Sequence, residues 1–283
     1  MTPPRPSFMK RFWQALRLRL FTALTLLPIV LGAIYYGEWV FTGLVVLVGL
    51  LVIREWTAML KAHRPQSANA LLAVLIIATL GGAAMTGPQL AVIAWLTGLV
   101  LSAGFAQIGW AERPVLLGGY AYLTLPLLAL VELRQMEDGA FLVLYLFVLV
   151  WLTDIFAMLA GKTIGGPKLA PVISPNKTWA GLLGGMMGAA AGGAAMAHIF
   201  GWKTMSLVVF LSAGFAVIAQ MGDLLESWIK RRYEVKDSGS LLPGHGGLLD
   251  RIDGLISVLA VTFLVLLGTG RMAEPAMSAL LKW

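Results

Sequence analysis

The chain has 283 residues, of which 59% are hydrophobic and only 12% are charged, with a net charge of +7 and a mean hydropathy of +0.83. Soluble domains are roughly 25% charged, so this composition excludes an ordinary water-soluble protein, whose surface is mainly in contact with water. The absence of cysteine excludes disulfides, thiolate metal ligands and cysteine nucleophiles.

Apolar segments that approach the ~20 residues needed to cross a bilayer as a helix recur along the whole chain. They are too long for the alternating strands of a membrane barrel. We therefore predict an all-α, polytopic helical membrane protein with about nine transmembrane helices. In chain order, the predicted spans are 21–36, 38–53, 69–86, 89–108, 115–131, 140–160, 179–200, 205–221 and 255–270.

Lysine and arginine are distributed unequally between the connections of these spans. If the N-terminus is cytoplasmic, 17 of the 21 Lys and Arg lie on the cytoplasmic side, where positive charge is favoured. The bias predicts a cytoplasmic N-terminus, and it places the two most polar connections, 161–178 and 222–254, in the cytoplasm. We expect the membrane to be a bacterial inner membrane.

The first polar stretch, "TDIFAMLAGKTIGGPKLAPVISPNKTWAGLLGG", covers residues 153–185. An ionisable residue inside an apolar span, such as Asp154, usually faces a polar cavity, although pairing with a lysine would also explain it. Ser174, Asn176 and Lys177 stand just before a predicted helix. A helix N-terminus beside a lysine favours anion binding, although an ordinary loop and cap would have the same sequence.

The second polar stretch contains two pairs of acids. Asp223 and Glu226 are three residues apart, as are Asp250 and Asp253, and this spacing puts each pair on one face of a helix. Adjacent carboxylates repel each other unless a cation neutralises them. With no cysteine and only three histidines, oxygen ligands favour Mg²⁺ over zinc.

Basic residues and glycines are interleaved with these acids. Carboxylates, a divalent metal and several cations together suit a polyphosphate, while glycines around His245 let the backbone approach a ligand. His245 is explained equally well as a turn residue. A solvated loop against anionic lipid would account for Arg231 and Arg232, but not for the interleaved acids and glycines.

The segment "SWIKRRYEVKDSGSLLPGHGGLLDRID", residues 227–253, closely resembles the signature of the phosphatidate cytidylyltransferase, or CDP-diacylglycerol synthase, family. The matching residues are Ser227, Lys230, Arg231, Lys236, Asp237, His245, Gly246, Gly247, Asp250, Arg251 and Asp253. The upstream motif, with Asp154, Ser174, Lys177 and Trp179, is also similar. Met158 and Ala180 depart from the family pattern, and the resemblance is weak before about residue 130.

This resemblance implies a nucleotidyltransferase that transfers CMP from CTP to phosphatidate, forming CDP-diacylglycerol and pyrophosphate for phospholipid biosynthesis. It implies a less specific N-terminal transmembrane region, 1–135, and a catalytic region, 136–283. The expected partners are CTP, phosphatidate and membrane lipid, with no nucleic acid.

By the same resemblance, Asp223, Asp250, Lys177 and Lys230 are the expected catalytic residues. Two Mg²⁺ sites are expected, with Asp223 and Asp250 as principal ligands and Asp253 and Asp154 as further ones. The expected substrate contacts are Ser174, Asn176, Lys177, Lys230, Arg231, Lys236, His245 and Arg251.

Other functions stay open at this point. A CTP-dependent lipid kinase, or a cytidylyltransferase acting on another lipid, would need similar cations and carboxylates. A transporter would use buried acids, but it would spread them through the spans rather than gather them in one block. The small-residue run at 184–197 permits a homodimer, and it equally permits packing within one subunit.

Overall fold

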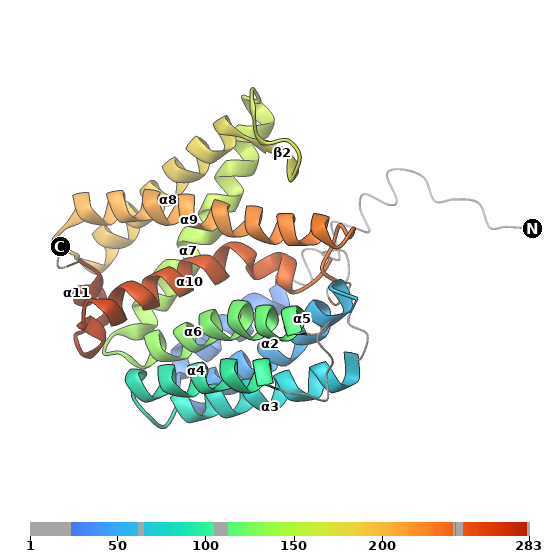
Figure 1. Ribbon diagram of the computed structural model, residues 1–283. Helices are drawn as coiled ribbons and strands as arrows, with labels where there is room; N and C mark the ends of the chain where they lie inside the picture. Colours follow the sequence, from blue (N-terminus) through green and yellow to red (C-terminus); the bar gives the residue numbers. More distant parts are fainter. Residues whose placement is uncertain (1–23, 62–64, 105–112, 240, 242–245, 282–283) are drawn as a thin grey trace, which may run out of the picture.

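The computed structural model describes residues 24–61, 65–104, 113–239, 241 and 246–281 (Figure 1). Most of the described residues are helical. The N-terminal half contains a helix at Leu24–Tyr36, followed by α2 (Glu38–Met59), α3 (Pro65–Ala83), α4 (Pro88–Gly104), α5 (Arg113–Gly119), the π-helical turn η2 (Tyr120–Thr124) and α6 (Leu125–Gln135).

The C-terminal half contains the longest helices. In chain order it has α7 (Gly139–Thr163), the strands β1 (Lys168–Ala170) and β2 (Ser174–Thr178), α8 (Trp179–Phe200), α9 (Met205–Arg232), α10 (Leu249–Gly268), the 3₁₀ turn η3 (Arg271–Ala273) and α11 (Ala276–Leu281). In Figure 1, α9 and α10 run beside each other, with α2, α3, α4 and α6 on the far side of α10 from α9.

Within the described residues, seven helical segments are long and apolar enough to cross a membrane. They are α2, Gln66–Ala83 of α3, the continuous Val115–Gln135, α7, α8, α9 and α10. The helices at Leu24–Tyr36 and Pro88–Gly104 are apolar but shorter. The protein is therefore an all-α polytopic membrane protein, while the count of nine spans and the side of the N-terminus stay predictions.

The connection between α9 and α10 is shorter than the expected 222–254. Helix α9 continues to Arg232, and α10 begins at Leu249. The charged residues can continue these helices because cations and carboxylates at helical spacing neutralise each other, as the Lys230–Glu226 pair does at 3.1 Å. The two acid pairs, Asp223/Glu226 and Asp250/Asp253, therefore lie on helices, as their three-residue spacing predicts.

Residues 168–178 form an antiparallel hairpin that the sequence did not predict. Lys168 pairs with Thr178 and Ala170 with Ser174. The hairpin leads directly into α8, where the Thr178 hydroxyl accepts a hydrogen bond from the Gly181 backbone at 3.0 Å as the N-cap. The hairpin thus holds Lys177 in a fixed position beside the membrane helices.

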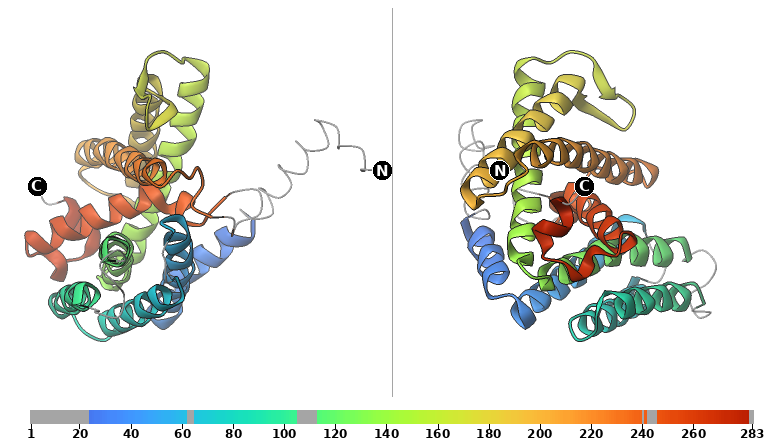
Figure 2. Two further views of the ribbon diagram at one scale, coloured as in Figure 1. Left: turned by 45° about the vertical axis from the view of Figure 1, so that its right-hand side comes forward. Right: turned by 90° about the vertical axis from the view of Figure 1, so that its left-hand side faces the viewer.

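The glycines of α8 bring it close to two helices of its own subunit. A side chain on Gly184, Gly188 or Gly192 would collide with α7, and one on Gly193 would collide with Ser212 of α9. Figure 2 shows α7 and α8 side by side, with the hairpin at their outer end. The small-residue run therefore serves packing within one subunit.

Candidate active site

One group of charged residues joins the hairpin to α9. The Lys177 ammonium group lies 2.7 Å from Asp223 Oδ2 and donates a hydrogen bond to Gln220 Oε1 at 2.8 Å. The Ser227 hydroxyl donates to Asp223 Oδ1 at 3.3 Å. Gln220, Asp223 and Ser227 share one face of α9 because they are spaced by three and four residues. The Lys177–Asp223 ion pair is partly exposed, with 32% of the Asp223 side chain accessible to solvent.

A second group joins α9 to α10 and is more deeply buried. Lys230 Nζ lies 2.8 Å from Asp250 Oδ1 and 3.1 Å from Glu226 Oε2. Glu226 is fully buried and Asp250 is 10% exposed. Asp250 Oδ2 also accepts hydrogen bonds from the backbone of Gly247 at 2.9 Å and of Ser238 at 3.1 Å. A buried ion pair is tolerated when further hydrogen bonds satisfy its oxygens in this way.

Two more aspartates belong to the same region. Asp154, on α7, interacts electrostatically with Asp253, Asp223, Lys177 and Arg251. Asp253, one turn after Asp250 on α10, interacts electrostatically with Asp223 and Glu226. The structure therefore brings together acids from three helices, α7, α9 and α10, with Lys177 of the hairpin beside them.

The remaining predicted residues lie around this region or outside the described chain. Arg231 donates to the carbonyl oxygens of Ile173, at 3.4 Å, and Val235, at 3.3 Å, so it links α9 to the hairpin. Ser174 and Asn176 lie on β2, and Asn176 and Lys236 are exposed. His245 lies outside the described residues. The substrate contacts of all these residues stay predictions.

The sequence gives no role to two residues of the site, Gln220 and Tyr122. Gln220 contacts Lys177 directly, and Glu226, which the sequence pairs with Asp223, contacts Lys230. The Tyr122 hydroxyl is buried, has no hydrogen-bond partner among the described residues, and interacts electrostatically with Glu226, Asp253 and Asp223. Tyr122 lies on η2, and π-turns inside helices often mark functional sites, but a single tyrosine in an apolar span gives no such signal in the sequence.

The donor chemistry of this region suits a hard divalent cation. Its acidic side chains offer only oxygen atoms, which Mg²⁺ prefers, and the buried Glu226 Oε1 has no hydrogen-bond partner among the described residues. No three acidic or histidine side chains in the described ranges converge on one metal position. In the structure, the Lys177 and Lys230 ammonium groups neutralise Asp223 and Asp250 instead.

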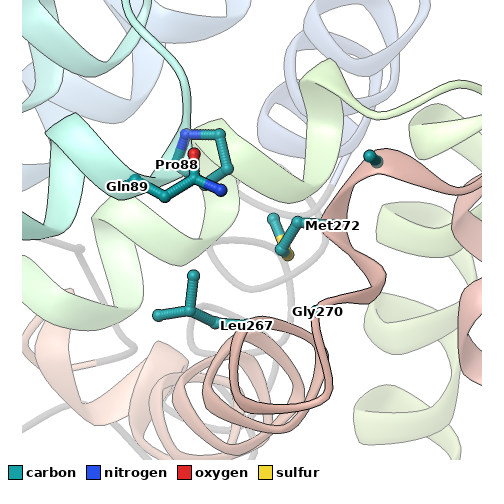
Figure 3. A pocket seen from close by; sticks show the side chains of 6 residues that line it. Pro88, Gln89, Leu267, Gly270 and Met272 are labelled. Carbon is teal, nitrogen blue, oxygen red and sulfur yellow. The ribbon is translucent and has the colours of Figure 1, made fainter.

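A surface pocket lies elsewhere in the described chain. It is lined by Pro88 and Gln89 of α4, by Leu267 of α10, and by Gly270, Met272 and Ala273 after the end of α10 (Figure 3). Asp250 lies at the other end of α10, about 27 Å away at 1.5 Å per residue. Because these six residues include no ionisable side chain, the pocket does not suit a polyphosphate.

Comparison with known proteins places the chain in a family. It matches the model of the cytidylyltransferase family over residues 17–268. It is 37% identical over 262 residues to the phosphatidate cytidylyltransferase of Brucella abortus, and the match covers 88% of this chain and 92% of that protein. The chain belongs to the cytidylyltransferase family.

Other relatives match over a smaller part of the chain. The phosphatidate cytidylyltransferase of Rickettsia bellii is 38% identical over 157 residues, which cover 53% of this chain and 68% of that protein. That of Rickettsia felis is 34% identical over 185 residues, covering 63% and 82%. The family match includes the region before residue 130, where the resemblance read from the sequence was weak.

Proposed function

We propose that the protein transfers CMP from CTP to phosphatidate, forming CDP-diacylglycerol and pyrophosphate. The observation that carries this proposal is the cluster of two lysines and five acids where α7, α9, α10 and the hairpin meet, in a chain of the cytidylyltransferase family. Both substrates are polyanions, one soluble and one membrane-bound. A cluster of this kind at the end of membrane helices suits a reaction between a soluble and a membrane-bound substrate.

The two lysines suit the binding and orientation of phosphate groups. Lys230 contacts two carboxylates, so its third N–H bond can donate to a phosphate oxygen. Lys177 contacts Asp223 and both oxygens of Gln220, and it would exchange the long 3.4 Å contact with the Gln220 carbonyl for a phosphate oxygen. Arg231, Lys236 and Arg251 add positive charge nearby, and Ser174 and Asn176 add hydrogen-bond donors on β2. Such transfers depend mainly on positioning and charge neutralisation.

In the proposed reaction, a phosphate oxygen of phosphatidate attacks the α-phosphorus of CTP. A new P–O bond forms, the bond from the α-phosphorus to the bridging oxygen breaks, and pyrophosphate leaves with the electron pair. Because the attacking oxygen is already anionic, no general base is needed. The role of the side chains is to align two negatively charged groups that would otherwise repel each other.

Asp223, Asp250, Asp253 and Asp154 would hold Mg²⁺, which we propose at two positions. When bound, the metal supplies positive charge to the oxygens of the reacting phosphates. The oxygen-only donor set supports this assignment. Glu226, whose Oε1 has no hydrogen-bond partner in the described part of the chain, is an additional candidate ligand. Asp250 is also the acceptor that holds the Ser238 and Gly247 backbone.

We further propose that the site faces the cytoplasm from a bacterial inner membrane. The unequal distribution of Lys and Arg supports this orientation, and CTP is available on that side. A homodimer is compatible with the outward face of α8, where Leu183 and Met187 are 58% and 72% exposed, and where either lipid or a second copy would cover them.

The direct test is an assay of the purified protein in detergent with phosphatidate, labelled CTP and varied Mg²⁺. The expected result is a labelled lipid and one pyrophosphate for each lipid formed. Release of CDP would instead identify a CTP-dependent lipid kinase, and would overturn the proposal.

A further inference from the structure

The carboxylate of Glu55, in the N-terminal half of the chain, contacts the signature segment directly. Glu55 is 4% exposed and lies one turn before the end of α2. Its Oε1 accepts a hydrogen bond from the Leu248 backbone at 2.9 Å, and its Oε2 accepts one from the Leu249 backbone at 2.9 Å. The Ser238 hydroxyl adds a third, longer contact of 3.4 Å to Oε2.

These contacts supply what the start of α10 lacks. The first N–H groups of a helix have no acceptor within the helix, and a polar residue at the N-cap usually satisfies one of them. Here the N-cap is Leu248, whose side chain makes no capping hydrogen bond. Glu55 takes over this role from another helix, and its negative charge is favoured by the α10 dipole.

Two glycines of the signature segment make room for this carboxylate. A Cβ atom on Gly239 would lie 2.5 Å from Glu55 Oε1, and one on Gly247 would collide with the Ser238 hydroxyl, itself in contact with Glu55, and would lie 2.8 Å from Glu55 Oε2. Both approaches are closer than real side chains make. The close packing of the Glu55 carboxylate therefore gives a physical reason for glycine at both positions.

The end of α2 that carries Glu55 is itself held in place. Trp56 Nε1 donates to the Val115 carbonyl at 2.9 Å, and its ring lies 5.6 Å from that of Tyr122. Both rings pack in an apolar cluster with Leu249. Glu55 is therefore held in place by the packing of α2, and the signature segment is hydrogen-bonded to its carboxylate.

We propose that Glu55 is a positioning residue for the reaction described above, and that it fixes the signature segment on which Asp250 depends. Asp250 accepts hydrogen bonds from Ser238 and Gly247, which belong to the same segment as the donors to Glu55. Glu55 thus acts through the backbone rather than on the substrates. This inference rests on the proposed function only for its kinetic consequence.

The test combines kinetics with a structural reporter. Because the chain has no cysteine, Ser238→Cys introduces one thiol at a position that is 4% exposed, and the rate of its reaction with maleimide reports opening of the segment. Glu55→Gln keeps the size of the side chain but removes its charge and places an NH₂ group among N–H donors. The control is Glu132→Gln on α6, an equally buried glutamate whose Oε1 has no hydrogen-bond partner among the described residues.

We expect Glu55→Gln, in the chain with Ser238 intact, to lower kcat by about ten- to a hundredfold, the range for lost hydrogen bonds to a buried charge, with a smaller change in the KM for CTP. In the Ser238→Cys chain it should accelerate labelling at least about tenfold. Glu55→Asp, which keeps the charge on a shorter side chain, should lower kcat less and accelerate labelling less than Glu55→Gln does. Glu132→Gln should change neither readout by more than about twofold.

A kcat for Glu55→Gln within about twofold of the unmodified protein would overturn the proposal, and so would a fall in kcat without faster labelling. If Glu55→Gln does not accumulate in the membrane, Glu55→Asp carries the same two readouts. Failure of the unmodified protein to make labelled lipid would overturn the proposed function instead, while the labelling rates would still decide whether Glu55 fixes the segment.

Discussion

Lys177 and Asp223 form a 2.7 Å ion pair that joins the hairpin before α8 to the middle of α9. The pair connects the two polar stretches of the sequence, and Asp154 and Asp253 interact with it electrostatically. The residues of the two motifs therefore form one site rather than two.

Asp223→Asn should abolish most of the turnover while the protein still inserts. The change removes the negative charge that faces Lys177, and the loss of one such electrostatic contact typically lowers kcat by about a hundred- to a thousandfold. The measurement is incorporation of labelled CTP into lipid by protein quantified in the membrane. Near-normal incorporation of labelled CTP by the Asp223→Asn variant would contradict the assignment of Asp223 to the active site.

A double-mutant cycle with Lys177→Met and Asp223→Asn measures whether the two residues act together. Groups in direct contact usually have coupling energies of about 0.5–3 kcal/mol, so the double mutant should be less impaired than the product of the two single effects. Strictly multiplicative effects on kcat/KM would contradict a shared site.

Lys230→Ala should lower thermal stability more than Lys177→Ala does. Lys230 neutralises a fully buried Glu226 and a 10% exposed Asp250, and removing one partner of a buried pair costs about 3–5 kcal/mol. The Asp223 partner of Lys177 is 32% exposed, so water screens the remaining charge. Unfolding midpoints of both variants in the same detergent give the comparison, and equal midpoints would contradict it.

Tyr122→Phe and Tyr120→Phe should have opposite effects on stability. The Tyr122 hydroxyl is buried without a hydrogen-bond partner in the described chain, so its removal relieves a cost of about 1–3 kcal/mol. Tyr120 forms a 2.6 Å hydrogen bond with Thr79, both buried, and its loss should destabilise the protein. A lower unfolding midpoint for Tyr122→Phe would show that this hydroxyl has a partner in the folded protein.

The predicted orientation can be tested with single cysteines, because the chain has none. Glu234→Cys, after α9, should react with an impermeant maleimide only from the cytoplasmic side; the Glu234 side chain is 87% exposed. Lys203→Cys, an exposed position between α8 and α9, should react only from the other side. The reverse pattern would invert the topology.

Much of the helical layout could be predicted from the sequence, because apolar length alone identifies membrane helices. Helices occupy the predicted segments 115–131, 140–160 and 179–200 to within a few residues at each end, apart from the four-residue extension of Val115–Gln135. Helices α9 and α10 extend beyond the predicted spans 205–221 and 255–270, because the charged residues that end the apolar runs continue the helices. Whether charged residues can continue a helix depends on partners such as Lys230 and Asp250, which are 20 positions apart.

The residues that the family resemblance indicated, Asp223, Asp250, Lys177 and Lys230, meet in two ion pairs, but their catalytic and metal-binding roles stay predictions. Which lysine meets which acid could not be predicted, because it depends on how the hairpin lies on α9. Glu55 carries no signal of its role in the sequence, because it follows Arg54 just outside the predicted span 38–53, where charged residues are expected. Its partners are backbone N–H groups, which no sequence pattern marks.

The most direct test of the central claim uses CTP labelled at either the α- or the γ-phosphate. With phosphatidate and Mg²⁺, the account predicts that the α-label enters the lipid fraction, that the γ-label is released as pyrophosphate, and that Asp223→Asn does neither. Transfer of the γ-label to lipid, or undiminished α-transfer by Asp223→Asn, would contradict it.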